Sequence, residues 1–158
     1  MKLRTITLVL AVLTVSIGLL AADDPFIGTW KLNLAKSKYG TVQPPKSSTR
    51  TAVAQGNGVK VSFDGVSADG SRFAYSYATN YDGKDSPISG VGQANGADTI
   101  AVKRVDANTT TATLKKAGKV VSTTTGTVSK DGKVYTIDSK GVDVNGKPRN
   151  VVSVYDKQ

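Results

Sequence analysis

Turn-forming residues recur along this chain at nearly even spacing, and that spacing limits the folds that the chain can adopt. Neighbouring signals lie about 12 to 14 residues apart, and Asp106-Ala107-Asn108 divides the one longer gap. The central positions of tight hairpin turns require positive φ, which Gly and Asn adopt most readily. The pattern therefore predicts a meander of short antiparallel strands. The signals are Asn57-Gly58, Asp69-Gly70, Asp82-Gly83, Asn95-Gly96, Ala117-Gly118, Asp131-Gly132 and Asn145-Gly146.

The segments between these turns are rich in Val, Thr and Tyr, which favour β-structure. Several alternate apolar and polar residues, as Val59, Val61 and Phe63 do, which indicates a sheet with one covered and one wet face. Closing such a meander into a barrel removes its exposed edges. We therefore expect an all-β, up-and-down antiparallel meander of about ten strands closed into a barrel. The expected strands are 26–34, 48–55, 59–66, 72–80, 86–90, 99–105, 109–116, 119–129, 133–140 and 149–157.

The first 22 residues have the organisation of a secretory signal peptide. Lys2 and Arg4 precede an apolar run over residues 6–20, which is short for a membrane-spanning helix, and Ala21-Ala22 supplies small residues. An uncleaved N-terminal anchor is the alternative. We expect export to the periplasm or the extracellular space, with removal of residues 1–22. The remainder, 23–158, is expected to be a single β-barrel domain with no stable membrane span.

Charge and missing residue types narrow the function classes. The formal net charge of +9 falls to +7 when Lys2 and Arg4 are removed, which favours anionic partners. Export argues against nucleic acid as a partner. The chain has no His and no Cys, so it lacks the commonest general base, the commonest metal ligand and any thiol nucleophile. We expect a non-catalytic protein that uses no metal and no cofactor.

The segment Pro25-Phe26-Ile27-Gly28-Thr29-Trp30-Lys31-Leu32 resembles the opening strand of the lipocalins and intracellular fatty-acid-binding proteins. In these calycin families a Gly-x-Trp packs at the closed end of the barrel, where Gly lets the strand bend. The segment 151–157 is similar to the closing strand of a fatty-acid-binding protein. The resemblance implies a lipocalin-like barrel with Gly28 and Trp30 at its floor. It also implies a basic residue packed on Trp30, for which Arg149 and Lys157 are the candidates.

Two features depart from the fatty-acid-binding proteins. Those proteins hold a carboxylate with an Arg two residues before the closing-strand Tyr, but Ser153 stands at that position before Tyr155. They also insert two helices after the first strand. The segment 35–46, which contains Pro44-Pro45, is too short for two helices.

An aromatic cluster and the closing-strand Tyr provide the candidate ligand-binding residues. Tyr combines an apolar body with a polar tip, which suits a partly hydrated cavity. Many Thr and Ser at interior positions favour a hollow barrel, although a thin core with a very polar exterior is the alternative. Core lining without a specific ligand is likewise an alternative for the aromatic cluster. The predicted ligand-binding residues are Phe73, Tyr75, Tyr77, Tyr81 and Tyr155.

The leading hypothesis is an exported, monomeric, non-catalytic barrel that binds a small apolar or amphipathic ligand. Two alternatives stay open. The protein could be a surface or matrix module that binds an anionic polymer, or a structural β-domain without a ligand. The polymer would bind two basic clusters, Lys115, Lys116 and Lys119 around one hairpin, and Lys31, Lys36, Lys38, Lys46 and Arg50 near the first loop.

Overall fold

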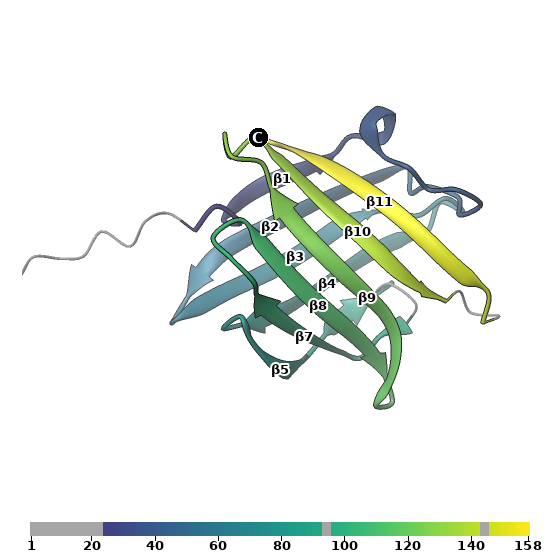
Figure 1. Ribbon diagram of the computed structural model, residues 1–158. Helices are drawn as coiled ribbons and strands as arrows, with labels where there is room; N and C mark the ends of the chain where they lie inside the picture. Colours follow the sequence, from purple (N-terminus) through teal and green to yellow (C-terminus); the bar gives the residue numbers. More distant parts are fainter. Residues whose placement is uncertain (1–23, 93–95, 143–145) are drawn as a thin grey trace, which may run out of the picture.

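The computed structural model describes residues 24–92, 96–142 and 146–158. The predicted signal peptide and the turn residues Asn95 and Asn145 lie outside the described residues. Within these ranges, eleven strands form one antiparallel sheet (Figure 1). The elements are β1 (Gly28–Leu32), the 3₁₀ turn η1 (Leu34–Lys36), β2 (Ser47–Gln55), β3 (Gly58–Val66), β4 (Arg72–Thr79), β5 (Asp82–Pro87), β6 (Ser89–Val91), β7 (Thr99–Arg104), β8 (Thr109–Lys116), β9 (Lys119–Val128), β10 (Val134–Val142) and β11 (Pro148–Lys157).

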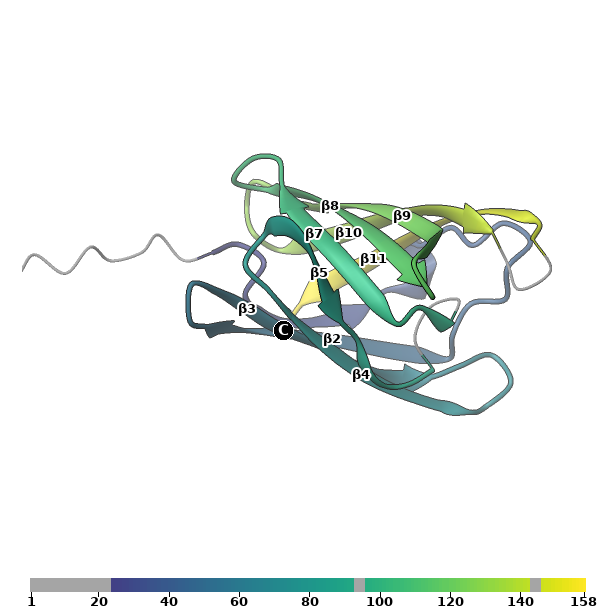
Figure 2. The same cartoon turned by 90° about the horizontal axis from the view of Figure 1, so that it is seen from below.

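The first and last strands of the chain, β1 and β11, pair in the middle of the sheet and so join its two halves. The strand order is β5-β7-β8-β9-β10-β11-β1-β2-β3-β4-β6, and Trp30 pairs with Lys157 across β1 and β11. The edges β5 and β6 follow one another in the chain and are joined at Ile88, so the sheet curls into a nearly closed barrel. In Figure 2, β7 to β11 form one wall and β2 to β4 the opposite wall. The predicted all-β antiparallel barrel is confirmed.

One predicted strand is divided in the structure. The segment 86–90 falls across the end of β5 and the start of β6, because Asp82-Gly83 does not make a hairpin turn. Positive φ at Tyr81 (59°) and Gly83 (78°) instead accompanies a bulge, after which β5 pairs with β7 while β4 pairs with β6. The hairpin predicted at this signal is therefore wrong. By contrast, Ala117 and Gly118 both adopt positive φ in the turn between β8 and β9, as predicted.

The segment after β1 contains the single turn η1 and continues the pairing of β1 along β11. The backbone N–H groups of Lys38 and Val152 each donate to the other residue's carbonyl oxygen, at 2.7 and 2.8 Å. The hydroxyl of Ser37 accepts from the backbone N–H of Val154 at 2.9 Å. Between β1 and β2 the segment contains no helix other than this turn, as its length predicted, and we call residues 33–46 the strap.

A cluster of buried aromatic side chains around Trp30 closes one end of the barrel. Trp30 is fully buried and packs against Tyr135 with ring centroids 5.6 Å apart. Gly28 holds φ at +127°, and a Cβ there would lie 3.0 Å from the Lys157 side chain. The Nζ atom of Lys157 lies 5.1 Å from the centroid of the Trp30 ring. Of the two predicted candidates, Lys157 is therefore the basic residue packed on Trp30. The placement of Arg149 at the barrel floor is wrong, because Arg149 lies at the opposite end of β11.

The substitution Gly28→Ala is expected to lower the free energy of unfolding by about 1 to 3 kcal/mol, because L side chains rarely adopt this φ. The added Cβ would also crowd Lys157. Denaturant unfolding with an unchanged m-value measures the loss. Thr29→Ala, one position along the strand, is the control and should cost clearly less. Equal stability of Gly28→Ala and the unsubstituted protein would show that this backbone bend does not need glycine.

Candidate functional site

A cavity of about 370 Å³ lies inside the barrel. Protein interiors are close-packed and rarely hold voids much larger than a water molecule, whereas small-molecule sites occupy about 300 to 1,000 Å³. Aliphatic side chains from both walls line the cavity, including Val61 on β3, Ile100 on β7 and Leu114 on β8. The barrel is therefore hollow, in agreement with the many hydroxyl residues expected at its interior positions.

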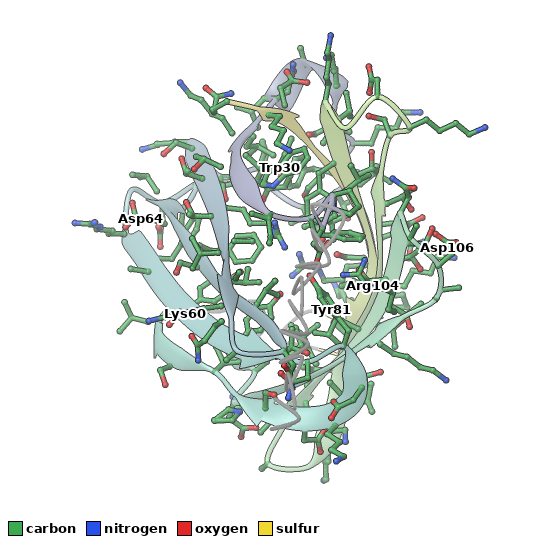
Figure 3. All side chains as sticks on the ribbon, turned by 90° about the vertical axis from the view of Figure 1, so that its left-hand side faces the viewer. Trp30, Lys60, Asp64, Tyr81, Arg104 and Asp106 are labelled. Carbon is green, nitrogen blue, oxygen red and sulfur yellow. The ribbon has the colours of Figure 1, made fainter. Side chains whose placement is uncertain are left out.

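The end of the cavity near Trp30 is closed by stacked charged and aromatic groups. The Arg104 guanidinium lies 4.0 Å from the centroid of the Tyr81 ring and 5.1 Å from that of Phe26. It also forms an ion pair with Asp24 at 2.6 Å. Figure 3 views the molecule from this end and shows Trp30, Tyr81 and Arg104 within the ring of strands. A ligand cannot enter past this plug without displacing it.

The opposite end of the cavity reaches the surface. The residues that line this end belong to the segment between η1 and β2, which includes the exposed Gln43, and to the β3–β4 turn. The exposed Gly92, directly after β6, also lines the cavity. Arg149 also lines the cavity at this end. The hydroxyls of Tyr39 and Ser153 hydrogen bond at 3.1 Å, which ties the strap to β11 beside the opening. We call this end the mouth of the cavity.

All five predicted ligand-binding residues line the cavity, namely Phe73, Tyr75, Tyr77, Tyr81 and Tyr155. The Tyr75 ring is central, because it stacks on Phe63 at 5.1 Å between ring centroids and meets Phe73 at 6.2 Å. Tyr81 follows β4 rather than lying on it, since that strand ends at Thr79. The structure brings these side chains together around one space. Their contact with a ligand stays a prediction.

Arg50 is one of the cavity-lining residues that the sequence analysis did not predict as part of the site, as are Tyr39 and Tyr135. The sequence predicts Arg50 in a surface basic cluster, but the structure places it inside the barrel with 3% of its surface exposed. Its Nη1 donates to the carbonyl oxygen of Phe26 at 3.0 Å, and its guanidinium carbon lies 4.7 Å from the Tyr135 ring centroid. Alternation could have found it, because Ser48 and Ala52 share the same buried face of β2. Arg is usually exposed, and that general tendency favours the wrong placement.

One lysine in each of the two predicted basic clusters forms an ion pair with an aspartate. Lys36 pairs with Asp156 at 2.9 Å, and Lys115 pairs with Asp85 at 2.7 Å. With Arg50 inside the barrel, the cluster near the first loop is weaker than the sequence suggests. Among the described residues no group of His, Cys, Asp and Glu side chains could hold a metal ion, and no helix there has the length and hydropathy to cross a membrane.

The phenols around the cavity stay protonated far above neutral pH. Burial raises the pKa of Tyr155 to about 12, against the opposing effect of its hydrogen bond with Ser48. Burial also raises the pKa values of Tyr75 and Tyr77 well above the ordinary value. Tyr75 and Tyr77 are nevertheless only half-buried, and both line the cavity, so part of their accessible surface faces it. They therefore offer the cavity neutral hydroxyl groups that can donate hydrogen bonds.

The chain was compared with protein families, curated proteins and solved structures. No family model and no curated protein matches it. A similar fold occurs in the crystal structure of the zebrafish ileal bile acid-binding protein complexed with cholic acid, with a TM-score of 0.50 and 12% sequence identity. The match covers 85% of this chain and 99% of that one. The fold is therefore that of a calycin barrel, as the Gly28-x-Trp30 resemblance implied, and this likeness concerns the fold alone.

The raised phenol pKa values predict the alkaline behaviour of the protein. In an unfolded chain the pKa of tyrosine is about 10, whereas the pKa of Tyr155 in the fold is about 12. The stability that depends on protonated phenols is thus fully present below about pH 10 and declines as pH rises toward the folded-state pKa. Ultraviolet absorbance titration should show fewer of the six tyrosines ionising near pH 10 in buffer than in urea. Identical curves in both solvents would contradict the buried placement of these rings.

Proposed function

We propose that this protein is a non-catalytic binding barrel that holds one small amphipathic molecule in its interior cavity. The observation that carries the proposal is the cavity of about 370 Å³, sealed by the Trp30 end and reaching the surface at the mouth. Aliphatic and aromatic side chains make up most of its walls, and hydroxyl, amide and guanidinium groups make up the rest, a mixture that small-molecule sites use. Burial of apolar ligand surface drives binding to such walls, and the polar groups orient the ligand.

Two further observations support binding rather than catalysis. The chain lacks His and Cys, and none of the described aspartates lines the cavity. The tyrosines that face the cavity hold their protons too tightly to act as bases at neutral pH. The likeness to a bile acid-binding protein solved with cholic acid also supports a small amphipathic ligand, because that molecule combines an apolar body with polar groups.

We also propose that the barrel works outside the cytoplasm as a monomer after removal of residues 1–22. The charged start, the apolar run and the small residues of this segment support export. Asp24, just beyond the proposed cleavage position, already belongs to the barrel through its ion pair with Arg104. Mass spectrometry of the protein recovered from its native host should give a chain beginning near residue 23, and a chain retaining Met1 would contradict export with cleavage.

The cavity is tested by filling it. Ala112 lines the cavity from β8, so Ala112→Phe should place a ring inside it and weaken binding of the neutral fluorescent probe N-phenyl-1-naphthylamine. We expect a loss of about tenfold or more, or about 1.4 kcal/mol. Thr113→Phe is the matched control, because the next residue of a strand faces outward, and it should bind as the unsubstituted protein does.

Two results would contradict ligand binding inside the barrel. The first is equal probe affinity in both phenylalanine variants, which would place the probe on the outer surface. The second is the failure of the unsubstituted protein to bind any such probe, together with the absence of small molecules in an organic extract of protein purified from its native host.

A further inference from the structure

Among the described residues, Arg50 is the only charged one that is buried. Its hydrogen bonding is incomplete. Its Nη1 donates to the carbonyl oxygen of Phe26, but its Nε has no hydrogen-bond partner. The Phe26 oxygen does not depend on Arg50, since it also accepts from the Trp30 indole at 3.2 Å. A donor is thus left unsatisfied in a side chain that lines the cavity.

No carboxylate in the described structure balances this cation. A guanidinium keeps its charge wherever proteins are folded, and buried charges are normally paired. None of the ion pairs among the described residues includes Arg50. Every acidic residue of the sequence is an aspartate, and of those described none is buried and none lines the cavity. The inner part of the cavity therefore carries positive charge without a counter-ion.

Neutral donors accompany the guanidinium. Burial keeps Tyr75 and Tyr77 protonated. Tyr75 lies in the same cross-strand row as Arg50, because Arg50 pairs with Phe63 and Phe63 pairs with Tyr75. An anion that reached this part of the cavity would meet the guanidinium of Arg50, which lines it, and phenolic hydroxyls. Charge-assisted hydrogen bonds of this kind are stronger than neutral ones, and low polarity strengthens them further.

The remaining walls suit an apolar body. Ile100, Val102, Leu114 and Val151 supply aliphatic surface to the cavity. A chain-like molecule whose acidic group lies at Arg50 would extend along these side chains toward the mouth. Arg149 is a second cation on the lining, but it is half-exposed, so water weakens its attraction for an anion.

From these observations we propose that Arg50 binds the acidic group of the ligand, so that the protein selects amphipathic anions, apolar molecules that end in a carboxylate, over neutral analogues of the same length. This proposal rests on the proposed function, since it requires that a ligand occupy the cavity. It assigns the carboxylate to β2, on the far side of β1 from the closing-strand position that Ser153 occupies.

The test compares decanoate with 1-decanol as competitors of N-phenyl-1-naphthylamine at neutral pH. In the unsubstituted protein, decanoate should bind about tenfold or more tightly than decanol. Arg50→Met keeps an unbranched side chain of similar length without the charge, and it should reduce the preference to within about twofold. Arg149→Met is the matched control, and it should retain the preference. The melting temperature of Arg50→Met should be unchanged or higher, because an unpaired buried charge is removed.

The outcomes separate this proposal from the proposed function. If neither competitor displaces the probe, small-molecule binding in the cavity is itself contradicted. If both bind equally well to the unsubstituted protein, or if Arg50→Met keeps the preference, the barrel binds ligands but the Arg50 site is overturned. A preference lost only in Arg149→Met would move the site to the mouth. Should Arg50→Met fail to fold, Arg50→Lys and Arg50→Gln replace it, and only the charged variant should favour decanoate.

Discussion

The pairing of the first and last strands around the buried Trp30 is the constraint on which the rest of the structure depends. The short strand β1 pairs with both β2 and β11, and it therefore joins the two walls. At this junction Trp30 is fully buried against Tyr135, and Lys157 covers its other side. The buried apolar cluster around Trp30 fills this end of the barrel, and two further buried clusters lie in the walls around the cavity.

The interior polar groups point to binding rather than to stability alone. A barrel under pressure for stability alone would gain from an apolar side chain in place of an unpaired buried cation. Arg50 instead lies beside Tyr135 in the inner part of the cavity, among phenols that burial keeps protonated. Such departures from a fully satisfied core are common at functional sites. The same barrel end thus contains both the fully buried Trp30 and the unpaired guanidinium of Arg50.

The fold was predictable because turn chemistry and strand alternation are local, whereas the errors involve partners distant in sequence. Positive φ at Ala117-Gly118 gave a hairpin, but the same signal at Asp82-Gly83 gave a bulge, since no local feature tells which strand will pair next. Strand register likewise decides that Lys157 covers Trp30. Alternation located Tyr75 and Tyr77 on the cavity-lining face of β4, but it did not indicate Tyr39 and Tyr135, which also line the cavity. For Arg50 it conflicted with the surface preference of Arg, and burial prevailed over that preference.

A crystal structure of the protein with 10-bromodecanoate tests the central claim most directly, because the anomalous signal of bromine locates one end of the ligand independently of the other. We expect one ligand inside the barrel, with its carboxylate within hydrogen-bond distance of the Arg50 guanidinium and its bromine toward the mouth near Tyr39. Bromine density confined to the outer surface of the barrel, beside a cavity that holds only water, would contradict ligand binding inside the barrel.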